Sequence, residues 1–251
     1  MAMSRILGAF ALVLLLLVSL LASSPARLVG LVLPAGQVVM QGFSGTVWQG
    51  NASRCLVRTP AGYLHLGAVS WRLSPASLAL FAPRLTLESR WGNQTLNTGL
   101  VLRGGDDIDL EALEATIPAD LLRQFVPVTL AGALSVQLEQ LKLRAGWPVE
   151  GSGRLVWQGG GWNSPSGPIP LGSYALDFRQ PAGSALAGEV VTLAGGVSAE
   201  GSVRLEDRSY DVDITVRGEG GLDERLQQAL SLMARPVDGG YRIKLEGEIE
   251  D

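Results

Sequence analysis

The strand signal is clearest in residues 210–217, whose sequence is Tyr-Asp-Val-Asp-Ile-Thr-Val-Arg. Polar and apolar side chains alternate there, and a β-strand places successive side chains on opposite faces. Residues 197–205, Val-Ser-Ala-Glu-Gly-Ser-Val-Arg-Leu, alternate in the same way. The polar residues 206–209 between the two runs predict a hairpin with one buried face and one solvated face.

The same alternation extends through most of the chain. Residues 84–91 and 94–102 predict a second hairpin, joined by a Gly-Asn turn. Residues 134–138 begin a further strand, but Leu141 and Leu143 change phase, so we expect a β-bulge near Gln140. The 32 Gly and 13 Pro among 251 residues are typical of a turn-rich β protein.

Three segments depart from this pattern. Residues 222–233 place Leu222, Leu226, Leu230 and Met233 on one stripe of a helix. Residues 109–117 and 118–125 predict two short helices broken before a proline, so that the helical region spans about residues 110–125. Residues 159–170 are rich in Gly and Pro and predict a long loop between two strands, either a partner contact or a plain connection.

An apolar segment of seventeen residues, 6–22, contains a single polar side chain, Ser19. As a helix it would span about 25 Å, at the short end for a hydrocarbon core of about 30 Å. Positive charge before the segment favours a cytoplasmic N-terminus. We expect an uncleaved single-pass anchor, and a cleaved signal peptide is the alternative. Anchor positions along the segment are Ile6, Phe10, Leu14, Leu17 and Leu21.

Composition excludes several classes of chemistry. One Cys and one His exclude a disulfide framework, a Cys-rich zinc module and a multi-histidine metal site, and a net charge of −4 is not that of a nucleic-acid-binding protein. We expect Cys55 to be a buried small side chain and His65 to be structural. Residues 106–109, Asp-Asp-Ile-Asp, lack a calcium-loop spacing and are expected at a helix start. No enzyme activity, metal or cofactor is expected.

Charge is distributed unevenly along the chain. Residues 1–105 hold eight Arg and one acidic residue, a balance of +7, whereas residues 106–251 hold twelve basic and twenty-three acidic residues, a balance of −11. Two interpretations are open: ends of the molecule that meet different surfaces, or sheets that each have their own solvated face.

Recurring motifs predict an internal repeat. Val-Trp-Gln-Gly occurs at residues 47–50 and 156–159, and Pro-Val occurs at 127–128 and 236–237, with 109 positions between the copies in both cases. Trp48 and Trp157 should therefore be equivalent, as should Pro127 and Pro236. We expect both tryptophans in the core, with the lining of an apolar groove as the alternative. The predicted fold is a curved antiparallel sheet of two sequential repeats, 28–143 and 144–251, each with a short helical region, behind the anchor at 1–27.

Motifs at residues 45–52, 69–75, 153–158 and 236–247, together with the N-terminal segment, resemble the type II secretion system protein N (general secretion pathway protein N) family. The resemblance implies a bacterial inner-membrane protein with its bulk in the periplasm, accessory to protein export across the outer membrane. It implies partners in the inner-membrane platform or the secretin, and no catalytic residues. The alternative is a curved-sheet periplasmic protein that binds or transfers lipid or another apolar ligand.

Overall fold

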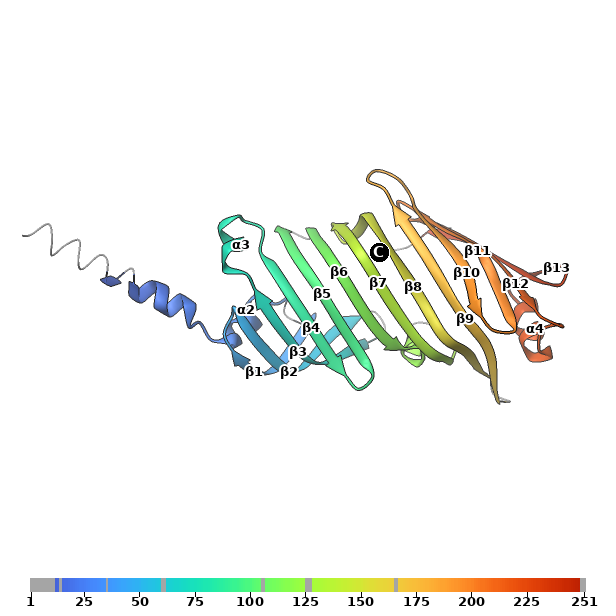
Figure 1. Cartoon of the computed structure of the whole chain (residues 1–251), viewed down its shortest axis with the longest axis horizontal. Helices are drawn as coiled ribbons and strands as arrows, with labels where there is room; N and C mark the ends of the chain where they lie inside the picture. Colours follow the sequence, from blue (N-terminus) through green and yellow to red (C-terminus); the bar gives the residue numbers. More distant parts are fainter. Residues whose placement is uncertain are drawn as a thin grey trace, which may run out of the picture. The chain divides into compact units, whose positions relative to one another are not determined.

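The computed structural model of the chain describes residues 12–13, 15–34, 36–59, 62–104, 107–124, 128–164 and 167–248. It forms two compact units, one ending at Trp91 and the other beginning at Gly92. Antiparallel strands dominate both units, as Figure 1 shows, so the prediction of a mainly β antiparallel fold is confirmed. The predicted boundary between repeats at 143/144 falls at the last residue of a strand that pairs with the next strand of the second unit, and two equivalent repeats stay a prediction.

The first unit begins with a helical stretch at residues 15–22, and within the described ranges no helix has the length and hydrophobicity needed to cross a bilayer. Two short helices, η1 (Ala26–Leu28) and α2 (Val29–Val32), lead into the sheet. Its strands, antiparallel neighbours in chain order, are β1 (Val38–Gly45), β2 (Gln49–Thr59), β3 (Gly62–Leu73) and β4 (Arg84–Trp91). The five-residue helix α3 (Pro75–Ala79) connects β3 to β4.

The core of the first unit is built around Trp71. Its indole N–H donates to the carbonyl of Val47 at 3.0 Å, and its ring meets Phe43 edge-on with 6.3 Å between centroids. Gly50 lies opposite Trp71 on the neighbouring strand, and a Cβ there would come within 2.6 Å of the indole ring. The bulky ring therefore requires glycine at this position. Ala26 of η1 completes the buried cluster from the helical side.

The second unit is an up-and-down antiparallel sheet. Its strands are β5 (Gln94–Gly104), β6 (Asp107–Pro118), β7 (Leu130–Arg144), β8 (Trp147–Ser164), β9 (Gly167–Gln180), β10 (Leu186–Ala194), β11 (Val197–Glu206), β12 (Ser209–Gly218), β13 (Arg235–Val237) and β14 (Gly240–Glu248). They lie side by side in chain order except that β14 pairs with β12 and β13 follows outside it. The 3₁₀ helix η2 (Ala119–Gln124) follows β6, and the helix α4 (Glu224–Ser231) follows β12.

Several strand predictions are confirmed. β11 and β12 pair in an unbroken register from Val197↔Gly218 to Glu206↔Ser209, as the alternation of residues 197–217 indicates. β4 has the predicted bounds, and β5 extends two residues beyond its predicted end. The expected bulge is also present, because the register of β7 against β8 shifts between Leu138 and Gln140.

Residues 109–117 are strand β6 rather than helix, so this prediction is wrong, and only residues 119–124 are helical. The leucines at 110 and 113 have a three-residue spacing that suggests a helix. In the sheet this spacing arises from a bulge at Ala112, which has a φ of 48°, opposite the bulge of β7. Pairing with β5 and β7 satisfies the backbone of β6 on both sides, and this tertiary context overrides helix propensity.

The loop predicted at residues 159–170 is also wrong, because the described residues of this range belong to the ends of β8 and β9. The register of the two strands shifts between Trp157 and Gly160, and Gly159 adopts a φ of 56°. A Cβ at Gly160 would lie 2.8 Å from the ring of Trp157. In the sequence these glycines predict an irregular loop, but in the structure they allow the bulged strand to continue.

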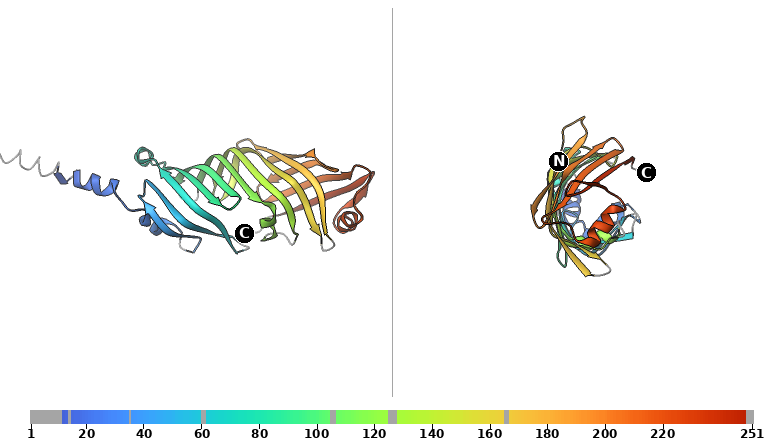
Figure 2. Two further views of the ribbon diagram at one scale, coloured as in Figure 1. Left: turned by 60° about the horizontal axis from the view of Figure 1, so that its bottom comes forward. Right: turned by 90° about the vertical axis from the view of Figure 1, so that its right-hand side faces the viewer.

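Helix α4 covers one end of the second sheet. Asp223 caps it by accepting a hydrogen bond from the backbone N–H of Arg225 at 2.9 Å. The predicted stripe is confirmed at Leu222, Leu226 and Leu230, which are buried against strand residues, whereas Met233 lies past the end of the helix and is exposed. Figure 2 shows α4 on the inner side of the curved sheet of this unit.

We expect Leu226→Asp to lower the free energy of unfolding by about 3 kcal/mol or more, because it buries a carboxylate among apolar side chains. The matched control is Leu245→Asp, at a leucine of β14 that is 47% exposed, where the new charge stays hydrated and the loss should be about 1 kcal/mol or less. Chemical denaturation of the purified variants measures both values. Equal losses of unfolding free energy in the two variants would contradict the conclusion that Leu226 is part of the buried core whereas Leu245 is open to solvent.

Candidate functional site

The inner face of the second sheet carries rows of apolar side chains across many strands. Directly opposed residues in antiparallel strands point to the same face, so the register defines each row. One row follows the sequence Leu96, Ala115, Val136, Leu155, Leu176, Val190, Gly201, Ile214 and Ile243. The next row follows Leu113, Leu138, Gly153, Phe178, Gly188, Val203, Val212 and Leu245.

Only part of this inner apolar face belongs to the hydrophobic cluster of α4. Val197, Val216 and Ile243 pack against the helix. By contrast, Leu155 and Leu176, further along the rows, are half-buried and lie outside that cluster. The inner apolar face is thus a surface of aliphatic and aromatic side chains that α4 covers at one end.

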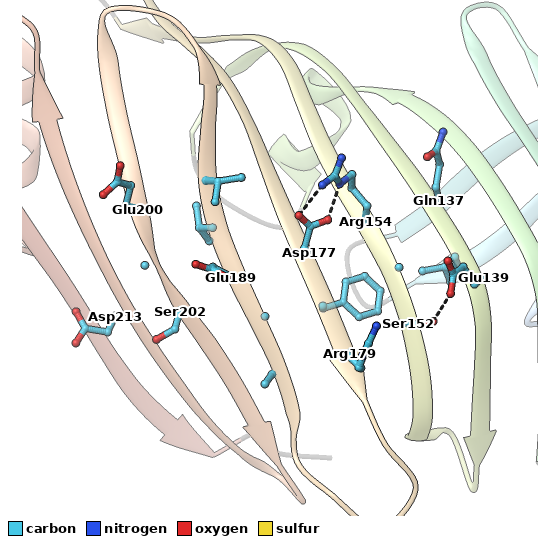
Figure 3. Close-up of a pocket in the computed structure, with 18 of the residues that line it drawn as sticks. Gln137, Glu139, Ser152, Arg154, Asp177, Arg179, Glu189, Glu200, Ser202 and Asp213 are labelled. Carbon is cyan, nitrogen blue, oxygen red and sulfur yellow. Dashed lines mark hydrogen bonds and ion pairs between the residues drawn. The ribbon is translucent and has the colours of Figure 1, made fainter.

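The outer face carries a parallel row of polar side chains. It follows Asn97, Glu114, Gln137, Arg154, Asp177, Glu189, Ser202, Asp213 and Lys244. Much of this row lines a broad depression of about 1510 Å³, drawn in Figure 3. Its charged lining consists of three arginines and six acidic residues, a balance of −3 (3 − 6): Arg154, Arg179, Arg242, Glu114, Glu139, Asp177, Glu189, Glu200 and Asp213.

Ion pairs cross between neighbouring strands of the depression. Arg154 donates from Nε and Nη2 to the two carboxylate oxygens of Asp177 at 2.5 and 2.7 Å, and the two side chains point toward one another in Figure 3. Arg242 holds Asp213 in the same two-pronged way. The hydrogen bonds from Arg154 lower the pKa of Asp177, and those from Arg242 lower the pKa of Asp213. Both carboxylates are therefore ionised at neutral pH, each matched to a guanidinium.

The depression offers charged contacts rather than a recognisable reaction centre. The described lining residues include neither histidine nor cysteine, and Ser152 donates its hydroxyl to Glu139 at 2.9 Å. Across the described part of the chain, no group of three or more His, Cys, Asp or Glu side chains could hold a metal ion. What the geometry provides is an array of carboxylates and guanidiniums on a sheet face, suited to contacts with a polar surface.

The acidic residues near 107 form an ion-pair cluster instead of the predicted helix start, and that prediction is wrong because they lie on β6. The nearly buried Asp109 accepts from Arg103 at 2.9 Å and from Arg144 at 2.7 Å. Burial by itself raises the pKa of Asp109, but the hydrogen bonds and positive charges of Arg144 and Arg103 outweigh it, and the pKa is lowered overall.

The two repeat-related tryptophans occupy different local settings. Trp48 lies in the turn between β1 and β2, and its indole N–H donates to the carbonyl of Leu21 at 2.8 Å. Trp157 lies within β8, where its indole N–H donates to the carbonyl of Ala131 at 2.9 Å. Both are partly buried, and their equivalence stays a prediction. Pro236 lies in β13, whereas Pro127 falls outside the described residues.

The anchor positions are only partly described. Ile6, Phe10 and Leu14 lie outside the described residues, whereas Leu17 and Leu21 are in the helical stretch at 15–22 and are exposed. Cys55, by contrast, is buried and free, as expected, and burial raises the pKa of its thiol. His65 lies in β3 with its ring 6.1 Å from that of Trp91, centroid to centroid.

Comparison with known proteins gives a direct family assignment. The family model described as type II secretion system (T2SS), protein N, matches residues 36–244, which include strands of both units. The chain belongs to the type II secretion system protein N family.

Two relatives whose names place them in this family align with the chain along nearly their whole length. The type II secretion system protein N of Aeromonas hydrophila is 28% identical over 246 residues, covering 92% of this chain and 93% of the relative. That of Vibrio cholerae serotype O1 is 29% identical over 252 residues, covering 93% and 94%. No solved structure matches this chain significantly.

Two features of the structure are not predictable from the sequence alone. The sequence predicts the outer polar row only in part, because alternation within one strand does not give the register of that strand against the next. The contact of Trp48 with Leu21 joins residues 27 positions apart, and no local pattern encodes it.

We expect Asp109→Asn to lower the free energy of unfolding by about 1 kcal/mol at pH 7, because both arginine partners are partly exposed and screened by solvent. The pKa of Asp109 is lowered in the folded state, so its stabilisation is present above the unfolded value of about 3.9 and is lost as the pH falls through the lower folded value. Stability of the natural chain should therefore fall more steeply on acidification than that of the variant. The free energy of unfolding is measured between pH 7 and pH 3, with Asp238→Asn at an exposed position as the control. If Asp109→Asn and Asp238→Asn showed the same dependence of stability on pH, the stabilising role of the Asp109 carboxylate would be contradicted.

Proposed function

We propose that this protein is a non-enzymatic accessory component of the type II secretion machine. The family match across residues 36–244 carries the proposal, because it includes strands of both units rather than one motif. Both relatives are named as protein N of the same system and align over nearly their full length. The role we assign is support of protein export across the outer membrane.

We further propose that residues 6–22 anchor the chain in the inner membrane and that both units lie in the periplasm. The segment is apolar except for Ser19, and its described part at 15–22 is helical. Arg5 before the segment favours a cytoplasmic N-terminus. A single spanning segment then places everything after it outside the cytoplasm.

The partners we propose are the inner-membrane platform or the secretin. The outer depression of the second unit supports a polar contact, since it presents carboxylates and guanidiniums, and two pairs of them, Arg154–Asp177 and Arg242–Asp213, are joined across adjacent strands. Such surfaces contribute specificity and orientation more than raw affinity, which suits a component that assembles with others.

In-cell crosslinking of the full-length, tagged chain should co-isolate inner-membrane platform proteins or the secretin. We expect Arg154→Glu to lower the yield of crosslinked partner several-fold, because it reverses one charge of the outer depression and places two carboxylates side by side. Arg204→Glu, an exposed arginine of the same sheet that does not line the depression, is the matched control. Recovery of no type II secretion component, in cells that produce the whole machine, would contradict the assembly role.

A second candidate function is binding of lipid or another apolar ligand on the inner apolar face. The observation in its favour is that Leu155 and Leu176 are only half-buried and lie outside the cluster covered by α4. An open aliphatic surface of this kind on one side of a sheet is suited to a ligand without hydrogen-bonding groups.

The second candidate predicts acyl-chain lipid in organic extracts of a purified form in which a cleavable signal peptide replaces the anchor. Leu245→Asp should reduce the amount bound, because it introduces a charge at the exposed end of one apolar row without entering the core. Mass spectrometry of the extracts gives the ratio of lipid to protein. Lipid-free protein, or equal lipid in the variant, would leave assembly as the sole candidate.

A further inference from the structure

The first unit presents large apolar side chains to solvent at one loop. Leu80 is 77% exposed and Phe81 is 92% exposed, directly after α3. On α2, Leu31 is 81% exposed and Val32 is 86% exposed. Apolar groups gathered at the surface of a small unit indicate a contact with another apolar surface.

The loop that carries Leu80 and Phe81 is built on a hydrogen-bonded base. Ser77 is buried, donates its hydroxyl to the carbonyl of Ser74 at 2.6 Å and accepts from the backbone N–H of Arg84 at 2.8 Å. The backbone N–H of Phe81 donates to the carbonyl of Leu78 at 3.0 Å. A φ of 53° at Phe81 turns the chain at the tip. The fold therefore holds these two side chains outward on a fixed support.

Strand direction places this tip at the same end of the sheet as the turn of Trp48. In an antiparallel meander the β1–β2 turn and the β3–β4 connection lie at one end, and the β2–β3 turn lies at the other. The backbone N–H of Leu73, at the end of β3, donates to the carbonyl of Trp48 at 2.7 Å. In both Figure 1 and Figure 2, α2 and α3 lie at the end of the unit where the N-terminal helical stretch enters.

The same end is tied to the helical stretch at 15–22. The indole N–H of Trp48 donates to the carbonyl of Leu21 at 2.8 Å, and the backbone N–H of Val47 donates to the carbonyl of Ser24 at 2.9 Å. Pro25 forms an isolated bridge with Thr46. When the apolar segment spans a bilayer, these contacts hold the β1–β2 turn at its exit, the depth at which tryptophan is favoured.

The first unit carries an excess of positive charge, and part of it lies at this end. Residues 23–91 contain six arginines and one acidic residue, Glu88, a balance of +5 (6 − 1). Arg27 is exposed and lies between the helical stretch and α2. Positive charge beside exposed apolar side chains fits the surface of a bilayer that contains anionic lipid, where headgroups attract arginine and the acyl boundary accepts leucine and phenylalanine.

We propose that the first unit makes a second membrane contact, in which Leu80 and Phe81 insert into an anionic bilayer surface beside the anchor, with α2 at the same surface. This contact rests on the proposed membrane anchoring. It restrains the sheet of the first unit against the membrane at two points, so that the unit does not swing freely on its anchor.

The test places an environment-sensitive fluorophore at the tip of the full-length chain. Cys55→Ala removes the native thiol, and Phe81→Cys provides a single labelling site. Because the side chain of Phe81 is 92% exposed, its replacement should leave the fold intact. Tyr63→Cys, at the opposite end of the same sheet and 47% exposed, is the matched control. Both labelled chains are reconstituted into vesicles of phosphatidylcholine and phosphatidylglycerol at a ratio of about 3:1, chosen to supply negative surface charge.

We expect the fluorophore at position 81 to emit at shorter wavelength and to be several-fold less accessible to aqueous iodide than the one at position 63. Vesicles of phosphatidylcholine alone should reduce this protection. Equal quenching at both positions, in chains that remain with the vesicles after carbonate washing, would overturn the contact while leaving the anchor intact. Chains that carbonate removes from the vesicles would overturn both the anchor and the contact.

Discussion

The constraint on which the second unit depends is the antiparallel register that keeps like side chains on one face. From β6 to β14 most opposed positions pair apolar residues with apolar residues and polar residues with polar residues, with exceptions such as Ala187, which lies opposite Arg179 and Arg204. A shift of one residue at any pairing would move a whole strand's apolar set to the outer face. The bulges of β6 at Ala112 and of β7 at Glu139 lie opposite one another, so the two strands change phase together and the rows continue.

A single curved layer has an inner face that needs cover, and the chain supplies that cover unevenly. Leu226 and Leu230 of α4 bury the inner face beside Val216 and Ile243. Further along the rows, the space above Gly188 is occupied by Leu176, since a Cβ at that position would lie 2.8 Å from its Cδ1. Neighbouring side chains thus close over glycines and shield part of the backbone without a second layer. This packing of side chains over glycines explains how the apolar face of a sheet with few helices is half-buried. The same face keeps part of its apolar surface exposed.

Much of this architecture could be predicted from the sequence, and the misses have definite physical causes. Alternation in residues 197–217 specifies a hairpin because local pattern and register agree there, and the phase change near Gln140 reveals a bulge. The same kind of bulge explains why the helix prediction for residues 109–117 is wrong, because the spacing of Leu110 and Leu113 across it matches that of a helical stripe. At residues 159–164, the glycines predict a loop, whereas in the structure they allow a bulged strand to pass close to Trp157. The outer polar row and the Trp48 contact depend on tertiary pairing, which a single sequence does not encode locally.

The two interpretations of the uneven charge apply to different parts of the chain. In the second unit, acidic side chains such as Asp177 and Asp213 are matched across strands by Arg154 and Arg242, so a solvated sheet face accounts for them. In the first unit, residues 23–91 hold six arginines and a single acidic residue, Glu88, a balance of +5 (6 − 1). Such an excess is balanced by counterions or by an anionic surface. The β1–β2 turn is bonded to the end of the N-terminal helical stretch. Under the proposed anchoring, the bilayer is therefore the surface nearest to this unit, and its anionic headgroups would balance this positive charge.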